Sequence, residues 1–207
     1  MKSDYILKLR KAACDTVLKS FVLKNKTPIW VCNIAESEPD PVEYYRQQKQ
    51  LSNERAICRN NCLPIALATS KQVKIDHTYQ YVRVVVGFMG SSDTNTTQSE
   101  LKKIKKKYLS LREFTDFETP FHAWVEVSND NFTTTEIIDL TYSFPHEKRK
   151  NIDNFSTNDA LDANLKHEAV LTDTKDVKSF FYYLLKSQLR DETELDTCFK
   201  VAVEHLD

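Results

Sequence analysis

Hydrophobic and polar positions follow both helical and strand-like spacings along the first half of the chain. Apolar residues recur every three or four positions over residues 4–24, which predicts an amphipathic helix. A short apolar run at 28–32 predicts a strand, and the polar stretch 42–50 predicts a second helix. Residues 79–88 are mainly β-branched and aromatic, which predicts a buried strand that ends at Gly87. The chain therefore begins as a mixture of helices and strands.

The middle of the chain contains a helix start and a predicted hairpin. Pro64 is tolerated in the first turn of a helix but not in its interior, so a helix is predicted to begin near Cys62 or one turn earlier. Residues 121–127 alternate with period two, and the apolar residues of 136–141 follow after a polar connector. This pattern predicts an antiparallel hairpin.

Helical spacing returns in the last fifth of the chain. Helices are predicted over 177–189 and 195–206, each preceded by an acidic or hydroxyl residue that suits a helix start. Residues 89–119 form the longest irregular stretch, and within it 101–108 predict a short solvated helix. The segment 146–162 is predicted to be the least ordered part of the chain.

These elements predict a single α+β domain of 207 residues, in which a helix packs on an antiparallel sheet and further helices are added at both ends. The predicted core spans about residues 54–142. A helical and strand extension over 1–53 precedes the core, and a helical region over 143–207 follows it. A hydrophobic content of 41% is high enough to exclude a wholly disordered chain.

The charge balance argues against two classes of partner. The 29 basic and 30 acidic side chains give a net charge of −1, which provides no overall attraction to nucleic acid or anionic lipid. No apolar stretch approaches the roughly 20 residues of a membrane helix. We therefore expect no membrane partner and no nucleic-acid partner. One lysine run could contact phosphates, form a solvated helix face, or help a loop beside a functional site to select acidic substrates: Lys102, Lys103, Lys105, Lys106 and Lys107.

Cysteine and glycine usage narrows the chemistry. Five cysteines are an odd number for a disulfide framework, and the N-terminus has no secretory pattern, so free thiols in a reducing compartment are expected. We expect the protein to be cytoplasmic when it is synthesised. Export as an effector by a signal-independent route is compatible with the same sequence. The two glycines, Gly87 and Gly90, exclude a glycine-rich phosphate loop and a dinucleotide fingerprint. We expect no cofactor and no metal.

Three residues together form a candidate nucleophilic site. Cys58 lies just before an apolar helical run, and a helix N-terminus beside an imidazolium stabilises a thiolate. His122 begins the first hairpin strand, on the face that also carries Trp124 and Glu126. Asp139 lies on the neighbouring strand, where its carboxylate could orient the imidazole. The pattern predicts a nucleophile, a base and an orienting group in the order Cys58, His122, Asp139.

The surrounding residues resemble the core of the transglutaminase-like superfamily of papain-like cysteine proteins. The similarity covers residues 57–142, and its segments are Cys58-Arg59-Asn60, residues 81–87, His122-Ala123-Trp124-Val125-Glu126-Val127 and Ile138-Asp139-Leu140-Thr141. The resemblance implies a papain-like fold with a Cys-His-Asp triad. It also implies acyl transfer through a thioester on a protein or peptide substrate, as in a protease, amidase, deamidase or transglutaminase.

Several alternatives stay open from the sequence. Cys62 competes with Cys58, because one helical turn could place either thiol near His122. A zinc site of Cys58, Cys62 and His122 has little support, since no second cysteine pair and no histidine pair accompanies it. A binding module that keeps the papain-like fold without catalysis is the competing functional class.

The remaining cysteines and histidines have ordinary structural interpretations. Three cysteines lie in apolar stretches and are predicted to be core residues: Cys14, Cys32 and Cys198. Four histidines have no recognisable partner and are predicted to lie at the surface: His77, His146, His167 and His205.

Overall fold

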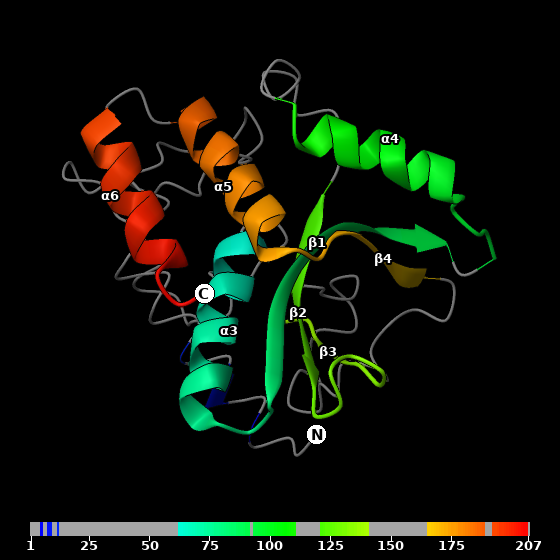
Figure 1. Cartoon of the computed structure of the whole chain (residues 1–207), viewed down its shortest axis with the longest axis horizontal. Coiled ribbons are helices and arrows are strands. Elements are labelled where there is room, and N and C mark those ends of the chain that lie inside the picture. The colour runs from blue at the N-terminus through cyan, green and yellow to red at the C-terminus, as the bar shows by residue number, and fades with distance from the viewer. Residues whose placement is uncertain are drawn as a thin grey trace, which may run out of the picture.

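A computed structural model of the chain describes Tyr5, Lys8, Leu9, Ala12 and residues 62–91, 93–110, 121–140, 165–188 and 192–206. Figure 1 shows an α+β arrangement with helices beside a sheet, which confirms the predicted class. The described helices are α3 (Cys62–Asp76), α4 (Gln98–Tyr108), α5 (Thr174–Gln188) and α6 (Glu192–Val203). The described strands are β1 (Tyr81–Ser91), β2 (His122–Ser128), β3 (Glu136–Ile138) and β4 (Leu165–Leu171).

The four strands form one antiparallel sheet in the order β3-β2-β1-β4. The pairing of β2 with β3 confirms the predicted hairpin. The prediction that the first strand ends at Gly87 is wrong, because β1 continues to Ser91. The extension is paired by β4, with Met89 opposite His167, and an irregularity between Val86 and Gly87 shifts the register. Strand β4 was not predicted from the sequence, and this explains why the extension of β1 beyond Gly87 was not predicted either. The two segments are hydrogen-bonding partners of each other.

Both faces of β2 are buried, although its two faces differ in character. Ala123, Val125 and Val127 join the hydrophobic core together with residues of α3, α5 and α6. Figure 1 shows these three helices together on one side of the sheet. The other face of β2 carries the polar side chains of His122 and Glu126, and both residues are buried. A buried polar side chain needs a partner, so this face must contain hydrogen-bonded or charged pairs.

Helix α3 lies at the centre of the packing, and Cys62 is its first described residue. Pro64 lies in the first described turn and, as a proline, has no backbone N–H to donate. Ten of the fifteen residues of α3 are buried, which is the pattern of a helix covered on nearly all sides. Lys74 Nζ donates to the carbonyl of His205, 2.7 Å away, which links α3 to the chain after α6.

Helix α4 confirms the prediction of a solvated helix. Thr97 and Glu100 form a reciprocal capping box at its start, and Tyr108 is its one buried residue. The lysines of the run are exposed, and Lys105 pairs with Asp176 of α5. Asp173 precedes α5 and accepts from the backbone N–H of Lys175 and Asp176.

Several sequence predictions fall outside the described residues. The strand at 28–32, the helix at 42–50 and the segment 146–162 are among them. The four described positions of the predicted helix 4–24 are helical, and Leu9 is fully buried. In the part of the chain that the structure describes, no helix combines the length and the apolar character needed to cross a bilayer.

Candidate functional site

The centre of the candidate site is a buried histidine–carboxylate pair. His122 is the first residue of β2, and Asp139 directly follows β3. Because Val125 pairs with Ile138, the next position of the β3 chain falls beside Trp124, two residues from His122 on the same face. His122 Nε2 lies 2.6 Å from Asp139 Oδ2, and the two side chains are 5% and 3% exposed. The hairpin thus brings together two of the three predicted site residues.

Gly87 makes room for the aromatic ring that lies beside this pair. Gly87 is opposite His122 in the sheet, two positions along from the pair of Val85 and Trp124 and on the same face. A Cβ atom at Gly87 would lie 2.7 Å from Cη2 of Trp124 and 2.0 Å from the carbonyl oxygen of Glu168. The indole of Trp124 stacks with the His122 ring at a centroid distance of 6.0 Å. The absent side chain therefore lets the indole and β4 approach the histidine.

A second histidine, His167, contacts the same carboxylate oxygen. Its Nε2 lies 2.8 Å from Asp139 Oδ2, and its side chain is only 3% exposed. The ring meets Trp124 edge-on at 4.7 Å. Within the described part of the chain, its Nδ1 is buried and has no hydrogen-bond partner. The prediction that His167 lies at the surface is wrong, because β4 places it beside the histidine–carboxylate pair.

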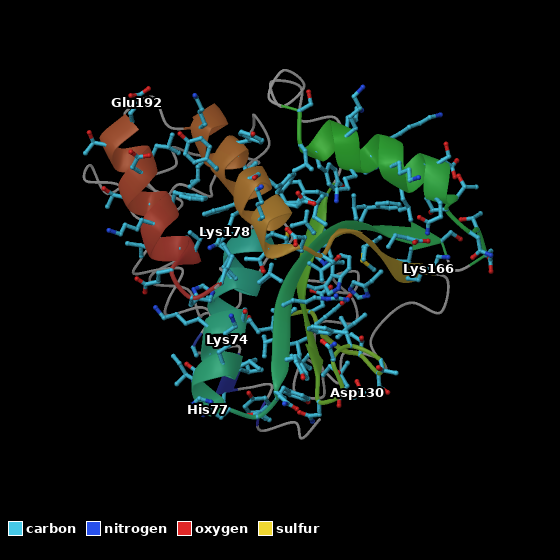
Figure 2. All side chains as sticks on the ribbon, in the orientation of Figure 1. Lys74, His77, Asp130, Lys166, Lys178 and Glu192 are labelled. Atoms are coloured by element: carbon cyan, nitrogen blue, oxygen red, sulfur yellow. The ribbon has the colours of Figure 1, made fainter. Side chains whose placement is uncertain are left out.

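The polar residues next to His167 explain why this position escaped prediction. Lys166 and Glu168 flank it, and their side chains pair with each other at 2.9 Å. Figure 2 shows Lys166 on the side of the sheet away from α6. A strand with charged residues on both sides of a histidine lacks the apolar alternation of a half-buried strand. Only its pairing with β1 reveals that His167 points to the buried face.

Cys62 acts on His122 from helix α3. Cys62 is the first described residue of α3 and is 1% exposed. Its side chain is among the groups that raise the pKa of the His122 imidazole, after Asp139. Cys58, the nucleophile predicted from the sequence, lies outside the described residues, as do Cys14 and Cys32. Cys198 is partly buried and packs against the hydrophobic core.

Tyr108 is a further residue of the site that the sequence did not indicate. It is the last residue of α4 and is buried, and its hydroxyl donates to the carbonyl oxygen of Gly87 at 3.1 Å. Burial raises the pKa of Tyr108, and negative charge on the nearby Cys62 raises it further. The phenol therefore stays protonated and keeps its role as a hydrogen-bond donor.

The electrostatics favour a charged His122–Asp139 pair. Burial by itself lowers the pKa of His122, but the charge and hydrogen bond of Asp139 together with the contacts of Cys62 outweigh it and raise that pKa to about 10. Burial raises the pKa of Asp139, and the charges and hydrogen bonds of His122 and His167 overcome this effect, so that the net direction is downward. The carboxylate stays ionised and holds a proton on the imidazole.

A partly buried ion pair supports Trp124 from its other edge. Arg83 Nη2 lies 2.6 Å from Glu126 Oε2, and Arg83 Nε also donates to that oxygen. The indole N–H of Trp124 donates to the other oxygen of Glu126 at 3.3 Å. The Arg83 guanidinium lies over the ring of Phe132, 4.1 Å from its centroid. The indole is thus fixed in orientation between this ion pair and the two histidines.

The arrangement is suited to two kinds of chemistry. A thiol beside an imidazole that is oriented by a carboxylate is the arrangement used for nucleophilic catalysis. Two imidazoles and a carboxylate are also ligands for a transition metal, and the donor atoms of His122, Asp139 and His167 all lie within 4.8 Å of one another.

Comparison with known proteins does not identify the chain. No protein-family model, no curated protein and no solved structure matches it. The similarity to the transglutaminase-like superfamily, and the papain-like fold that it implies, therefore remain predictions from the residues.

Proposed function

We propose that this protein is a cysteine-dependent acyl-transfer enzyme in which Cys62 is the nucleophile, His122 the base and Asp139 the residue that orients the base. The observation that carries the proposal is the buried His122–Asp139 pair, on which Cys62 acts. The Cys62 side chain contributes to the raised pKa of His122, whose Nε2 lies 2.6 Å from Asp139 Oδ2. A structural cysteine needs no ionisable partner, whereas a nucleophilic one needs a base whose ring is held by a third group.

The neighbouring histidine also favours Cys62 as the nucleophile. A positive charge on the imidazole of His122 stabilises a thiolate beside it. Cys58 precedes Cys62 by four residues and remains the candidate that the resemblance implies. The two assignments make opposite predictions for alanine variants, so experiment can decide between them.

The proposed reaction balances through one covalent intermediate. Because Nε2 of His122 holds Asp139, we assign Nδ1 to the sulfur, and this nitrogen takes the thiol proton. The sulfur forms a bond to the carbonyl carbon of an amide, the carbon–nitrogen bond breaks, and the imidazolium returns the proton to the leaving amine. Water or a second amine then attacks the thioester, which releases a carboxylic acid or a new amide and restores the thiol.

Burial of the nucleophile sets a condition on this function. With Cys62 only 1% exposed, a carbonyl carbon reaches the sulfur only after neighbouring chain moves aside. The same burial supports the competing function, a papain-like binding module that does not catalyse. A closed enzyme reacts with electrophiles through transient opening, whereas a silent module shows only the background reactivity of its most exposed thiol.

Competitive alkylation separates these functions. The reduced protein is treated with a limiting amount of iodoacetamide near pH 7, and the labelled cysteines are identified by peptide mass spectrometry. Cys198 serves as the internal control, because it is more exposed than Cys62 and is not part of the buried pair. We expect Cys62 to be labelled before Cys198 despite its burial, because an activated thiolate reacts faster than a thiol. This gain should outweigh the reduced access of iodoacetamide to the buried sulfur.

Matched variants complete the test. Cys62→Ala should abolish preferential labelling, while Cys58→Ala should keep it, and both should keep the circular dichroism of the wild type. Labelling of Cys58 before Cys62 would return the nucleophile to Cys58. Labelling of Cys198 alone would support the silent module. Incubation of the wild type and Cys62→Ala with a cell lysate then shows, from deamidated, cleaved or cross-linked peptides, which acceptor completes the reaction.

A further inference from the structure

Two imidazoles converge on one carboxylate oxygen in the buried site. Oδ2 of Asp139 lies 2.6 Å from Nε2 of His122 and 2.8 Å from Nε2 of His167. The three side chains come from β2, β4 and the residue after β3, and they are 5%, 3% and 3% exposed. Orienting a catalytic histidine requires one carboxylate contact, so the second histidine exceeds what the proposed reaction uses.

We propose that His122, Asp139 and His167 form a binding site for Zn²⁺, and that the bound metal switches off the thiol chemistry. The second half of this inference rests on the proposed function, whereas the first half does not. No metal was expected from the sequence, and the zinc site considered there used Cys58, Cys62 and His122. Only His122 is shared with the site inferred from the structure, because strand β4, which supplies His167, was not predicted.

The geometry of the three donors suits a zinc ion. Zinc takes imidazole nitrogen and carboxylate oxygen at about 2.0–2.2 Å, which in a tetrahedral site separates neighbouring donors by roughly 3.3 Å. The two nitrogen–oxygen contacts of 2.6 and 2.8 Å need to open by about 0.7 and 0.5 Å. Mg²⁺ prefers an octahedron of oxygen ligands, which this donor set does not offer.

The surroundings of the donors favour binding rather than side-chain rearrangement. Trp124 packs against both histidine rings, and its indole N–H is held by Glu126. The ligands are therefore ordered before a metal arrives, which reduces the entropic cost of binding. The carboxylate of Asp139 is the one donor of the three that can bring a negative charge to the cation.

The metal and the base function exclude each other through the tautomer of His122. Without metal, Nε2–H donates to Asp139, and Nδ1 is left to accept the proton of Cys62. With a metal on Nε2, a neutral ring carries its one hydrogen on Nδ1 and can no longer accept that proton. Among the described residues, Cys62 is not part of the close donor group, so the sulfur is not needed to hold the metal.

Calorimetry on matched variants tests the site directly. Metal-depleted protein is titrated with ZnCl₂, and separately with MgCl₂, in the presence of a phosphine reductant. We expect one Zn²⁺ per chain for the wild type and for Cys62→Ser, and no binding of Mg²⁺. His167→Gln should bind at least about tenfold more weakly. The Gln amide can replace Nε2 as a donor to Asp139 but is a poor zinc ligand, so thermal unfolding should show that this variant stays folded.

Each outcome decides one half of the inference. Unchanged zinc affinity in His167→Gln would overturn the site, and loss of binding in Cys62→Ser would assign the metal to the sulfur instead. For regulation, the rate of Cys62 alkylation is measured with and without Zn²⁺. In the wild type, we expect Zn²⁺ to slow the alkylation of Cys62 and a chelator to restore its rate. In His167→Gln, Zn²⁺ should leave the alkylation rate unchanged. Zinc binding without this slowing would refute the regulatory half. Failure of the proposed function itself would appear as absent preferential labelling, while calorimetry would still judge the metal site.

Discussion

Replacing Gly87 with alanine should destabilise the protein far more than replacing Gly90, although the two glycines lie on the same strand. Neither has a positive φ, so backbone conformation does not distinguish them. At Gly87 the new Cβ would lie 2.0 Å from the carbonyl oxygen of Glu168, whereas at Gly90 its nearest neighbour is Cγ of the Glu168 side chain at 2.8 Å. A side chain can rotate away, but a carbonyl in a strand ladder moves only with the strand.

The expected magnitude follows from that displacement. Normal carbon–oxygen contacts exceed 3 Å, so β4 would have to move by about 1 Å at this point, which weakens one or two ladder hydrogen bonds of about 1 kcal/mol each. Displacement of Trp124, whose Cη2 is 2.7 Å from the new atom, adds overpacking of about 1–3 kcal/mol. We expect a loss of about 3 kcal/mol for Gly87→Ala. For Gly90→Ala we expect a change within about 1 kcal/mol, since alanine also lowers the entropy of the unfolded chain.

Urea unfolding followed by circular dichroism provides the measurement. With a dependence of about 2 kcal/mol per molar urea, Gly87→Ala should lower the midpoint by roughly 1.5 M, and Gly90→Ala should leave it nearly unchanged. Preferential labelling of Cys62 should also decrease in Gly87→Ala, because the indole and β4 no longer fix the histidines. Equal midpoints for the two variants would refute the argument that the close approach of β4 at Gly87 determines this region.

Three further predictions concern other parts of the fold. Arg83→Met should lower the free energy of unfolding in urea by about 2–4 kcal/mol, because it leaves the buried carboxylate of Glu126 without its cation. A smaller loss of stability for Arg83→Met than for Glu126→Gln would contradict that reasoning. Thr97→Ala should cost about 1 kcal/mol by removing the capping box, with Thr97→Ser near neutral as the control. Burial lowers the pKa of His205 from 6.5 to about 4. As the pH falls, the imidazole is therefore protonated in the unfolded state before it is protonated in the folded state, and the free energy of unfolding should decrease between about pH 6.5 and about pH 4. The difference in stability between the wild type and His205→Gln should change only in that window, and a constant difference would refute the assignment.

The parts of the site that the sequence revealed are those with local patterns. The period-two alternation of 121–127 and the polar connector after it were sufficient to predict the hairpin that joins His122 to Asp139. Pro64 and the apolar run after it were sufficient to predict the helix that includes Cys62. Both rest on steric and hydrogen-bonding rules that act over a few residues, which is why they could be read from the chain alone.

The parts that escaped prediction depend on contacts between distant segments. The strand around His167 is defined by pairing with β1, nearly 80 residues earlier, and its own charged residues hide that pairing. The choice between Cys58 and Cys62 depends on which thiol faces His122, which the spacing of one helical turn does not determine. Tyr108 ends a lysine-rich helix, and only the packed sheet shows that its hydroxyl reaches Gly87.

The unequal burial of two helices gives the molecule a gradient of local stability. Helix α3 buries ten residues, whereas α4 buries Tyr108 alone and adds the surface pair between Lys105 and Asp176. Release of α4 is therefore a less costly partial unfolding than release of α3, and the amide hydrogens of α4 should exchange with solvent well before those of α3. Because Tyr108 lies close to Cys62 and binds the strand opposite His122, such a fluctuation would loosen the surroundings of the sulfur while the sheet stays intact. The anchoring phenol would thus set how often the buried thiol becomes accessible, independently of how reactive it is.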